Sequence, residues 1–345
     1  MVNRNFFENF ESVYIIAEIG VNHNGDINLA KKLIDKAKES GASAVKFQSY
    51  KAEKLANTNT PKVKYQKINS KDKKESHFQM LKKYELSVKD HFILNEYCNK
   101  ICIDFLSTPY DVESAKLLNN LNVKLFKVAS ADIVDFQLHK YISTTYKPTI
   151  LSTGMSSLEE IKMALNFYNL EKSSIILLHC VSSYPCSLRS LNLNSIKILN
   201  NFFDLPVGFS DHSTDSSAAC LATALSSKII EKHLTLDKNM QGPDHKASST
   251  PEEFANLVKD IRKTEMILGK PVKAIQEEEL EMRMVSRKGL YLSKNVKVTQ
   301  KVKEEDFELK RPGLGISPLE INTMIGKSYR RDLREGDLIK KEDIF

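Results

Sequence analysis

Two histidines of this 345-residue chain follow consecutive apolar runs, where their ring nitrogens could bind a metal ion. His212 comes directly after LPVGFSD (205–211), and His233 ends SKIIEKH (227–233). If these runs are neighbouring parallel strands, both imidazoles reach the same edge of a sheet. Two neutral imidazoles with oxygen donors suit a divalent ion such as Mn, Fe, Co or Zn. A single histidine at a strand end would instead be read as structural or as a general acid or base.

Two lysines lie inside apolar runs, where their charge needs a partner. Lys46 belongs to ASAVKFQ (42–48), and Lys127 belongs to VKLFKVAS (123–130). A buried ammonium group is costly unless an opposite charge pairs with it. An anion with a phosphate and a carboxylate would supply that charge, and serine and threonine hydroxyls at other strand ends would complete its shell. Alternatively, each lysine reaches solvent at the rim or pairs with Glu18 or Glu231.

These side chains need a scaffold that gathers strand ends, and the hydrophobic pattern predicts one. Short apolar runs alternate with amphipathic helical segments through the first 270 residues. Eight strand–helix units match an α/β fold of the (β/α)8 TIM barrel type better than an open sheet, and in that barrel the carboxyl ends of the strands form one mouth. The predicted strands are 13–20, 42–48, 102–108, 123–130, 147–154, 174–180, 205–211 and 227–233.

The pattern changes after Gly269. A charged connecting segment follows, and from Arg287 the chain has short β-like runs, GLYLSKNVKV and GDLIKKEDI, with glycine and proline turns. We therefore predict a barrel domain over 1–270, a linker over 271–286 and a small β-rich domain over 287–345. Within the barrel, the polar excursion over 51–75 is long enough to form a lid.

Composition describes an ordinary soluble globular chain, with 41% hydrophobic and 28% charged residues. The net charge of +7 is concentrated in the lysine-rich stretch 62–83, which has few aromatics and matches no nucleic-acid module. A solvated surface explains it better. No run is apolar enough to span a membrane, no signal core is present, and the five cysteines form no CxxC pair. We expect a cytoplasmic protein with no nucleic-acid or membrane partner.

The remaining motifs narrow the function further. The chain has no Walker A, Rossmann or nucleophile-elbow motif, which argues against nucleotide, dinucleotide and serine-hydrolase functions. His179 fits a core histidine with satisfied hydrogen bonds, and His23 and His245 fit rim positions. The other three, His77, His91 and His139, are expected at the surface.

Nine stretches in order resemble the sialic acid (N-acetylneuraminate) synthases and their relatives that make legionaminic and pseudaminic acids. The resemblance extends from about residue 13 to 340, and the C-terminal segment resembles the antifreeze-like (SAF) domain of these enzymes. Some family members have Asn in the place of Ser182 and Glu in the place of Asp132. The matching stretches are IIAEIGVNHNGD, AVKFQSYKAEKL, FLSTPYD, FKVASADI, ILSTGMSS, LLHCVSSYP, VGFSDHS, EKHLTLDKNMQGPDHKAS and KRPGLGISP.

This resemblance implies condensation of phosphoenolpyruvate with N-acetylmannosamine or a related 2,4-diacetamido-trideoxy hexose, giving a nine-carbon 2-keto acid and phosphate. It implies a divalent metal, Mn or Mg, held by His212 and His233, and a catalytic role for these histidines with Glu18. The implied sugar contacts are Gln48, Tyr184, Asp244 and Arg311. The implied phosphoenolpyruvate contacts are Lys46, Thr108, Lys127, Ser130, Ser152, Ser182 and Ser210.

The resemblance also implies a homodimer in which each small domain covers the partner's barrel, so that Arg311 acts in trans. Two rival functions stay open at this point. One is another phosphoenolpyruvate–aldose synthase of the octulosonate type, which the appended small domain and the GPDH turn (242–245) disfavour. The other is a non-catalytic sugar-binding barrel, which the paired lysines and paired histidines disfavour.

Overall fold

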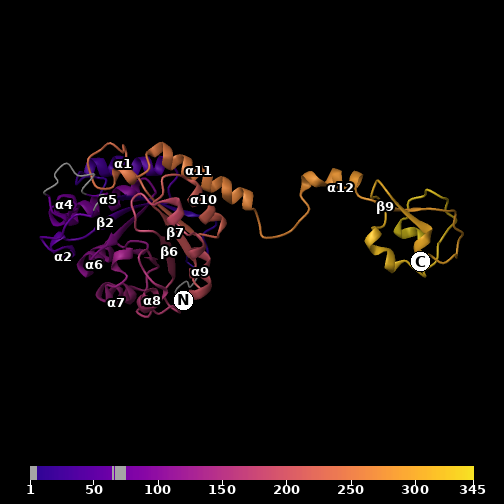
Figure 1. Ribbon diagram of the computed structural model, residues 1–345, viewed down its shortest axis with the longest axis horizontal. Helices are drawn as coiled ribbons and strands as arrows, with labels where there is room; N and C mark the ends of the chain where they lie inside the picture. The colour runs from indigo at the N-terminus through magenta and orange to yellow at the C-terminus, as the bar shows by residue number, and fades with distance from the viewer. Residues whose placement is uncertain (1–5, 64–65, 67–74) are drawn as a thin grey trace. The chain divides into compact units, whose positions relative to one another are not determined.

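The computed structural model describes residues 6–63, 66 and 75–345, and it divides into two compact units, 1–269 and 270–345. Part of the predicted lid and of the lysine-rich stretch lies outside the described residues. The first unit contains eight parallel strands surrounded by helices (Figure 1). The strands are β1 (Tyr14–Gly20), β2 (Ala44–Ser49), β3 (Asp104–Pro109), β4 (Phe126–Val128), β5 (Thr149–Ser152), β6 (Ile175–Cys180), β7 (Val207–Asp211) and β8 (Ile229–His233).

The strand order is β3-β2-β1-β8-β7-β6-β5-β4, and β4 packs against β3, so the sheet curls into a nearly closed barrel. This confirms the predicted (β/α)8 fold. The helices that follow the strands are α1 (Ile27–Glu39), α5 (Val88–Lys100), α6 (Val112–Asn120), α7 (Phe136–Thr145), α8 (Leu158–Leu165), α9 (Asn194–Phe203), α10 (Ser217–Ala224) and α11 (Pro251–Leu268).

Polar residues start several of these helices where the sequence supplies a cap. Ser157 and Glu160 form a capping box at α8, and Thr250 and Glu253 form another at α11. Each box satisfies backbone N–H groups that a helix leaves unpaired at its first turn. The chain therefore leaves each strand and enters the next helix at a defined residue.

The alternation of side chains along each strand separates two apolar layers. One set packs between the strands and the helices and forms the main core, with members such as Ile15, Val45 and Phe209. The other set points into the barrel, with Ile16 and Leu106 among its members, and Phe7 packs there as well. Because successive strand residues face opposite sides, Glu18 and Thr108, two positions beyond Ile16 and Leu106, also face the barrel interior.

Within the described residues, two further helices lie between β2 and α5. They are α2 (Ala52–Leu55) and α4 (His77–Tyr84). The sequence patterns predicted neither of them, because the lysines of this stretch indicated a solvated surface. Met80 and Leu81 are nevertheless buried.

The second unit contains α12 (Leu280–Ser286) and an antiparallel pair, β9 (Gly289–Leu292) and β10 (Phe307–Lys310). Isolated bridges, such as Tyr291 with Leu338, tie the last residues to this pair. Its own hydrophobic core includes Leu290, Tyr329 and Ile339. A small β-rich fold with a separate core is the architecture that the turn-rich sequence predicted.

Candidate active site at the carboxyl ends of the barrel strands

A cavity of about 430 Å³ opens where the barrel strands end. Its lining combines nearly all of the side chains that the sequence indicated. Arg311 is the exception, since it is an exposed residue of the second unit. The predicted residues that line the cavity are Glu18, Lys46, Gln48, Thr108, Lys127, Ser130, Ser152, Ser182, Tyr184, Ser210, His212, His233 and Asp244.

Two lysines and two glutamates form a buried charged cluster in this cavity. Lys46 Nζ lies 2.6 Å from Glu18 Oε2 and 3.7 Å from Glu231 Oε2. Lys127 Nζ lies 3.6 Å from Glu231 Oε1. All four residues are less than 5% exposed. The alternative that the lysines pair with Glu18 or Glu231 therefore describes the structure, and a bound anion would share these cations with the carboxylates.

The surroundings shift the pKa values of these four groups in different directions. Burial raises the pKa of Glu18, Glu231 raises it further, and Lys46 opposes the shift. Burial also acts on Glu231, but the neighbouring Lys127 and Lys46 bring its pKa down to about 2. Burial lowers the pKa of Lys127, whereas Glu18 and Glu231 outweigh burial and raise the pKa of Lys46. The shifts of Glu18 and Lys127 thus both favour the neutral form of the group.

Hydroxyl groups face the cavity near these cations. Lys46 Nζ donates to Thr108 Oγ1 at 3.1 Å, and Ser210 Oγ donates to Glu231 Oε1 at 2.9 Å. Ser152 Oγ is buried and has no hydrogen-bond partner among the described residues. Buried hydroxyls are normally paired, so an unpaired one in a cavity is suited to bind a ligand oxygen.

Gly154 brings the serine groups together. Its N–H donates to Ser130 Oγ at 3.0 Å. A Cβ atom added at Gly154 would lie 2.6 Å from Ser182 Oγ and 2.9 Å from Ser130 Oγ. Only a glycine allows the backbone to approach the two hydroxyls so closely.

The two histidines lie side by side, with ring centroids 5.7 Å apart. His212 Nδ1 donates to the carbonyl of Val181 at 2.8 Å, so Nε2 carries the lone pair, and Ser210 Oγ lies 3.5 Å from it. Burial lowers the pKa of both imidazoles, so both are neutral at physiological pH. His233 Nδ1 is buried without a hydrogen-bond partner in the described part of the chain. Neutral rings of this kind, one of them oriented by a backbone carbonyl, fit a metal ion.

Across the described residues, no group of three or more His, Cys, Asp or Glu side chains is arranged to hold a metal ion. Tyr184 packs against both rings, with centroids 4.1 Å from His212 and 5.7 Å from His233.

Sequence reasoning missed several residues that line the cavity. Glu231 was noted only as a partner for lysine, although its alternation with His233 places both on the interior side. Tyr110 follows β3, and loops after barrel strands are expected at the mouth. Asp132, noted in the sequence only as a position where some family members have Glu, follows β4 and also lines the cavity. Burial, reinforced by Asp135 and opposed by Lys127, raises the pKa of Asp132 to about 7. Met80 of α4 also lines the cavity, and no sequence signal indicated it.

The predictions for the other histidines were partly wrong. His179 is a satisfied core histidine, since its Nε2 contacts the carbonyl of Leu191 at 2.6 Å. His91 and His139 are buried rather than exposed, and His23 and His245 are buried rather than at the rim. His91 is accommodated because Ser49 Oγ and the carbonyl of Ser87 contact its two nitrogens. Burial of an imidazole is tolerated when both ring nitrogens find partners.

Known proteins resemble this chain over nearly all of its length. It is 43% identical to the N,N'-diacetyllegionaminic acid synthase of Campylobacter jejuni, with 95% of this chain and 98% of that protein covered. It is 32% identical to the human N-acetylneuraminate-9-phosphate synthase, with 95% and 92% covered. The crystal structure of the N-acetylneuraminic acid (sialic acid) synthetase from Leptospira borgpetersenii matches with a TM-score of 0.70 at 36% identity, covering 79% of this chain and 90% of that one.

Family models match both units. The SAF domain model covers residues 287–344, and the NeuB family model covers residues 33–273. The match to the NeuB family model spans more than half of the chain and includes most of the strand ends that form the cavity. This chain therefore belongs to the NeuB family.

Proposed function

We propose that this chain condenses phosphoenolpyruvate with the aldehyde of an N-acetylated amino sugar, releasing phosphate and forming a nine-carbon 2-keto acid. The observation that carries the proposal is the cavity in which two buried lysines, an unpaired serine hydroxyl and two neutral imidazoles converge. The names of the relatives, synthases of such acids, support the same reaction class.

Similarity to the relatives also supports one acceptor over another. Identity is 43% to the N,N'-diacetyllegionaminic acid synthase and 32% to the N-acetylneuraminate-9-phosphate synthase. We infer that a 2,4-diacetamido-trideoxy hexose is preferred over N-acetylmannosamine.

Lys46 and Lys127 would bind the anionic groups of phosphoenolpyruvate. Lys46 lies in β2 and Lys127 in β4, both at interior positions, and both already share their charge with Glu231. Ser152, with its unpaired hydroxyl, and Thr108, next to Lys46, would add hydrogen bonds to the same oxygens. Charge-assisted hydrogen bonds of this kind are about twice as strong as neutral ones.

The reaction joins C3 of phosphoenolpyruvate to the aldehyde carbon, whose oxygen takes up a proton. Cationic character then develops at C2, water adds there with loss of a proton, and phosphate leaves as the C–O bond breaks. Glu18 is suited to stabilise that cation or to hold a proton, because burial raises its pKa and Lys46 lies 2.6 Å away. Gln48 Nε2 donates to Glu18 Oε1 at 3.3 Å and orients the carboxyl group.

His212 and His233 would hold the divalent metal, Mn or Mg, with substrate oxygens completing its shell. Such an ion would polarise the aldehyde oxygen as a Lewis acid. The hydrogen bond from His212 Nδ1 to Val181 places the lone pair on Nε2, the atom that would face the ion. Tyr184 and Asp244, which also line the cavity, would contact the sugar.

The second unit would complete the site from a partner molecule. We propose a homodimer in which Arg311 contacts the sugar bound in the partner's barrel.

All five cysteines are free thiols, which supports a reducing compartment such as the cytoplasm. No helix in the described ranges is long and apolar enough to cross a membrane.

The function is tested by incubating the purified full-length protein with phosphoenolpyruvate, Mn and each acceptor in separate reactions. We expect stoichiometric release of phosphate and formation of a 2-keto acid, faster with the diacetamido sugar. Chelation should abolish the release, and Mn or Mg should restore it. His212→Ala, with an unchanged melting temperature, is the matched inactive control. Full turnover after chelation would exclude the metal, and no release with either sugar would exclude the function.

A further inference from the structure

The cavity has an apolar wall that none of the assigned functions uses. This wall comes from α4 and α2, and His77 at the start of α4 lines the cavity beside it. Met80, Leu81 and Tyr84 are each less than 8% exposed, yet all three line the cavity. Leu55 of α2 lines it as well. The charged cluster and the hydroxyls come instead from the barrel strands and the loops that follow them.

The wall is packed separately from the barrel core. Met80 and Tyr84 form a small cluster with Val21, and Leu81 forms another with Tyr50 and Ala52. Neither cluster belongs to the main core between strands and helices. Among the described residues, these small clusters hold the apolar side of α4, and polar contacts supplement them.

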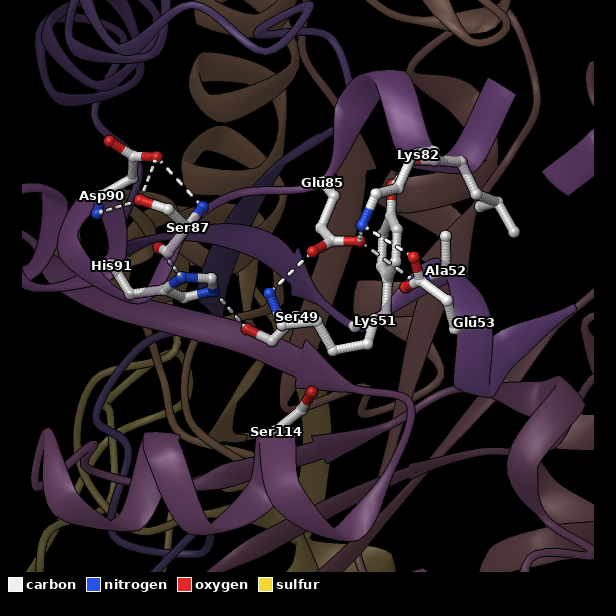
Figure 2. Close-up of polar contacts among 12 residues, drawn as sticks. Ser49, Lys51, Ala52, Glu53, Lys82, Glu85, Ser87, Asp90, His91 and Ser114 are labelled. Carbon is white, nitrogen blue, oxygen red and sulfur yellow. Dashed lines mark hydrogen bonds and ion pairs between the residues drawn. The ribbon is translucent and has the colours of Figure 1, made fainter. Parts of the chain in front are cut away.

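Glu85 supplies those polar contacts (Figure 2). Its carboxylate accepts from Lys51 Nζ at 2.6 Å, from the backbone N–H of Ala52 at 3.1 Å and from Lys82 Nζ at 3.3 Å. Lys82 also pairs with Glu53 at 2.9 Å. Glu85 follows the last residue of α4, whereas Ala52 and Glu53 begin α2, so this one side chain ties the two helices together.

Local geometry explains why a glutamate is needed at this position. Lys51 precedes α2 and provides no side-chain hydrogen bond to the first turn, so Glu85 caps that helix from outside. Burial would raise the pKa of Glu85, but hydrogen bonds from Lys51, Ala52 and Lys82 lower it below its ordinary value. Tyr50 adds a second tie, because its hydroxyl donates to the carbonyl of Leu81 at 3.1 Å.

We propose that the α4 wall selects the acceptor sugar and that Glu85 positions this wall through α2. The proposal rests on the function proposed above. Since phosphoenolpyruvate occupies the lysines and hydroxyls, the aldehyde has to lie beside them and the rest of the sugar has to extend along the remaining lining. A 2,4-diacetamido-trideoxy hexose carries a methyl group at its far end, where N-acetylmannosamine carries a hydroxyl.

An apolar wall discriminates between these two ends. The methyl group packs against Met80 and Leu81 and leaves no polar group unpaired. A hydroxyl in the same place gives up its hydrogen bonds to water. An apolar pocket disfavours a ligand with one added hydroxyl by roughly a hundredfold at most. The wall therefore favours the deoxygenated acceptor, and a polar replacement in the wall should weaken that preference.

The test compares kcat/KM for both acceptors in wild type, Met80→Gln and Glu85→Gln. For Met80→Gln, we expect the preference for the trideoxy sugar over N-acetylmannosamine to fall by about tenfold or more. For Glu85→Gln, the KM for the acceptor should rise about fivefold, with the KM for phosphoenolpyruvate within twofold of wild type, because only the wall has moved. Lys82→Met, which removes one ion pair from the same carboxylate, should shift the acceptor KM in the same direction.

Glu265→Gln is the matched control. Glu265 of α11 is also a partly buried glutamate that accepts from a backbone N–H, that of Val13, and from a cation, Arg262. Val13 precedes β1, so this contact lies at the end of the strand opposite to the cavity. Its replacement should leave both KM values unchanged. An unchanged sugar preference in Met80→Gln, or an equal rise of both KM values in Glu85→Gln and Lys82→Met, would overturn the proposal. If wild type itself releases no phosphate with either sugar, the proposed function fails instead.

Discussion

Substitutions at Lys46 allow an effect on phosphoenolpyruvate binding to be distinguished from an effect on stability. It is buried, and its ammonium pairs with Glu18 at 2.6 Å. Lys46→Met keeps the length of the side chain but removes the charge. Phosphoenolpyruvate binding, measured by calorimetry, should weaken by roughly a hundredfold or more, because a buried anion would lose a charged partner. Removal of one partner of a buried ion pair should also cost about 3–5 kcal/mol of stability.

A double variant distinguishes these two effects. In Lys46→Met/Glu18→Gln the unpaired carboxylate is gone, so the melting temperature should recover most of its loss. Phosphoenolpyruvate binding should stay weak. Lys127→Met is the companion variant, and its looser pair with Glu231, 3.6 Å, predicts a smaller loss of stability with a similar loss of binding. Wild-type affinity in the double variant would show that Lys46 does not bind the anion.

The sequence indicated most of this cluster at the residue level, because a lysine inside an apolar run is unusual enough to require a partner. The sequence did not decide which carboxylate pairs with each lysine. The alternation along β8 placed Glu231 in the barrel, but only the spatial arrangement shows that Glu231 serves both lysines while Glu18 pairs with one.

The turn after β5 brings Gly154 close to Ser130 and Ser182. Gly154→Ala would force these hydroxyls apart, because the added Cβ would lie within 3 Å of both. Overpacking of this kind costs about 1–3 kcal/mol. Since the displaced groups are proposed ligands of phosphoenolpyruvate, its KM should rise about tenfold while the KM of the acceptor changes less.

Gly208 provides the control for that substitution. It lies within β7, and an added Cβ would lie 2.6 Å from Leu178 Cδ2 and 2.7 Å from the carbonyl of Ile229. The crowding matches that at Gly154, but apolar and backbone atoms cause it. Gly208→Ala should therefore lower the melting temperature without a specific change in the phosphoenolpyruvate KM. If both variants raise that KM equally, the effect of Gly154→Ala is general destabilisation.

Elements with long, regular patterns were predictable, and short ones were not. Each of the eight barrel strands begins within three residues of the predicted start, since buried parallel strands give continuous apolar runs. Helix α4 escaped prediction because its apolar side consists of a few residues among lysines. Strand β10 escaped because its four residues, FELK, are too few to establish an alternation.

At the scale of the whole molecule, the chain exposes apolar side chains around the junction of its two units. Met266 and Ile267 near the end of α11 are 75% and 70% exposed, and Val272 is 70% exposed. In α12, Met282 is 65% exposed. Exposed apolar side chains that recur along one stretch of the sequence often mark an interface. A second copy of the chain is the partner that the proposed homodimer supplies, and a two-fold arrangement would cover the same residues on both copies.

Mixing two inactive variants tests whether Arg311 acts on its own barrel or on that of its partner. His233→Ala removes a proposed metal ligand, and Arg311→Ala removes the proposed sugar contact. After the two chains are unfolded together and refolded, half of the dimers are mixed. If Arg311 acts in trans, each mixed dimer has one site with an intact barrel and an intact arginine, so the mixture should recover roughly a quarter of wild-type phosphate release. If Arg311 serves its own barrel, every site still lacks one group, and the mixture should stay as inactive as its parents.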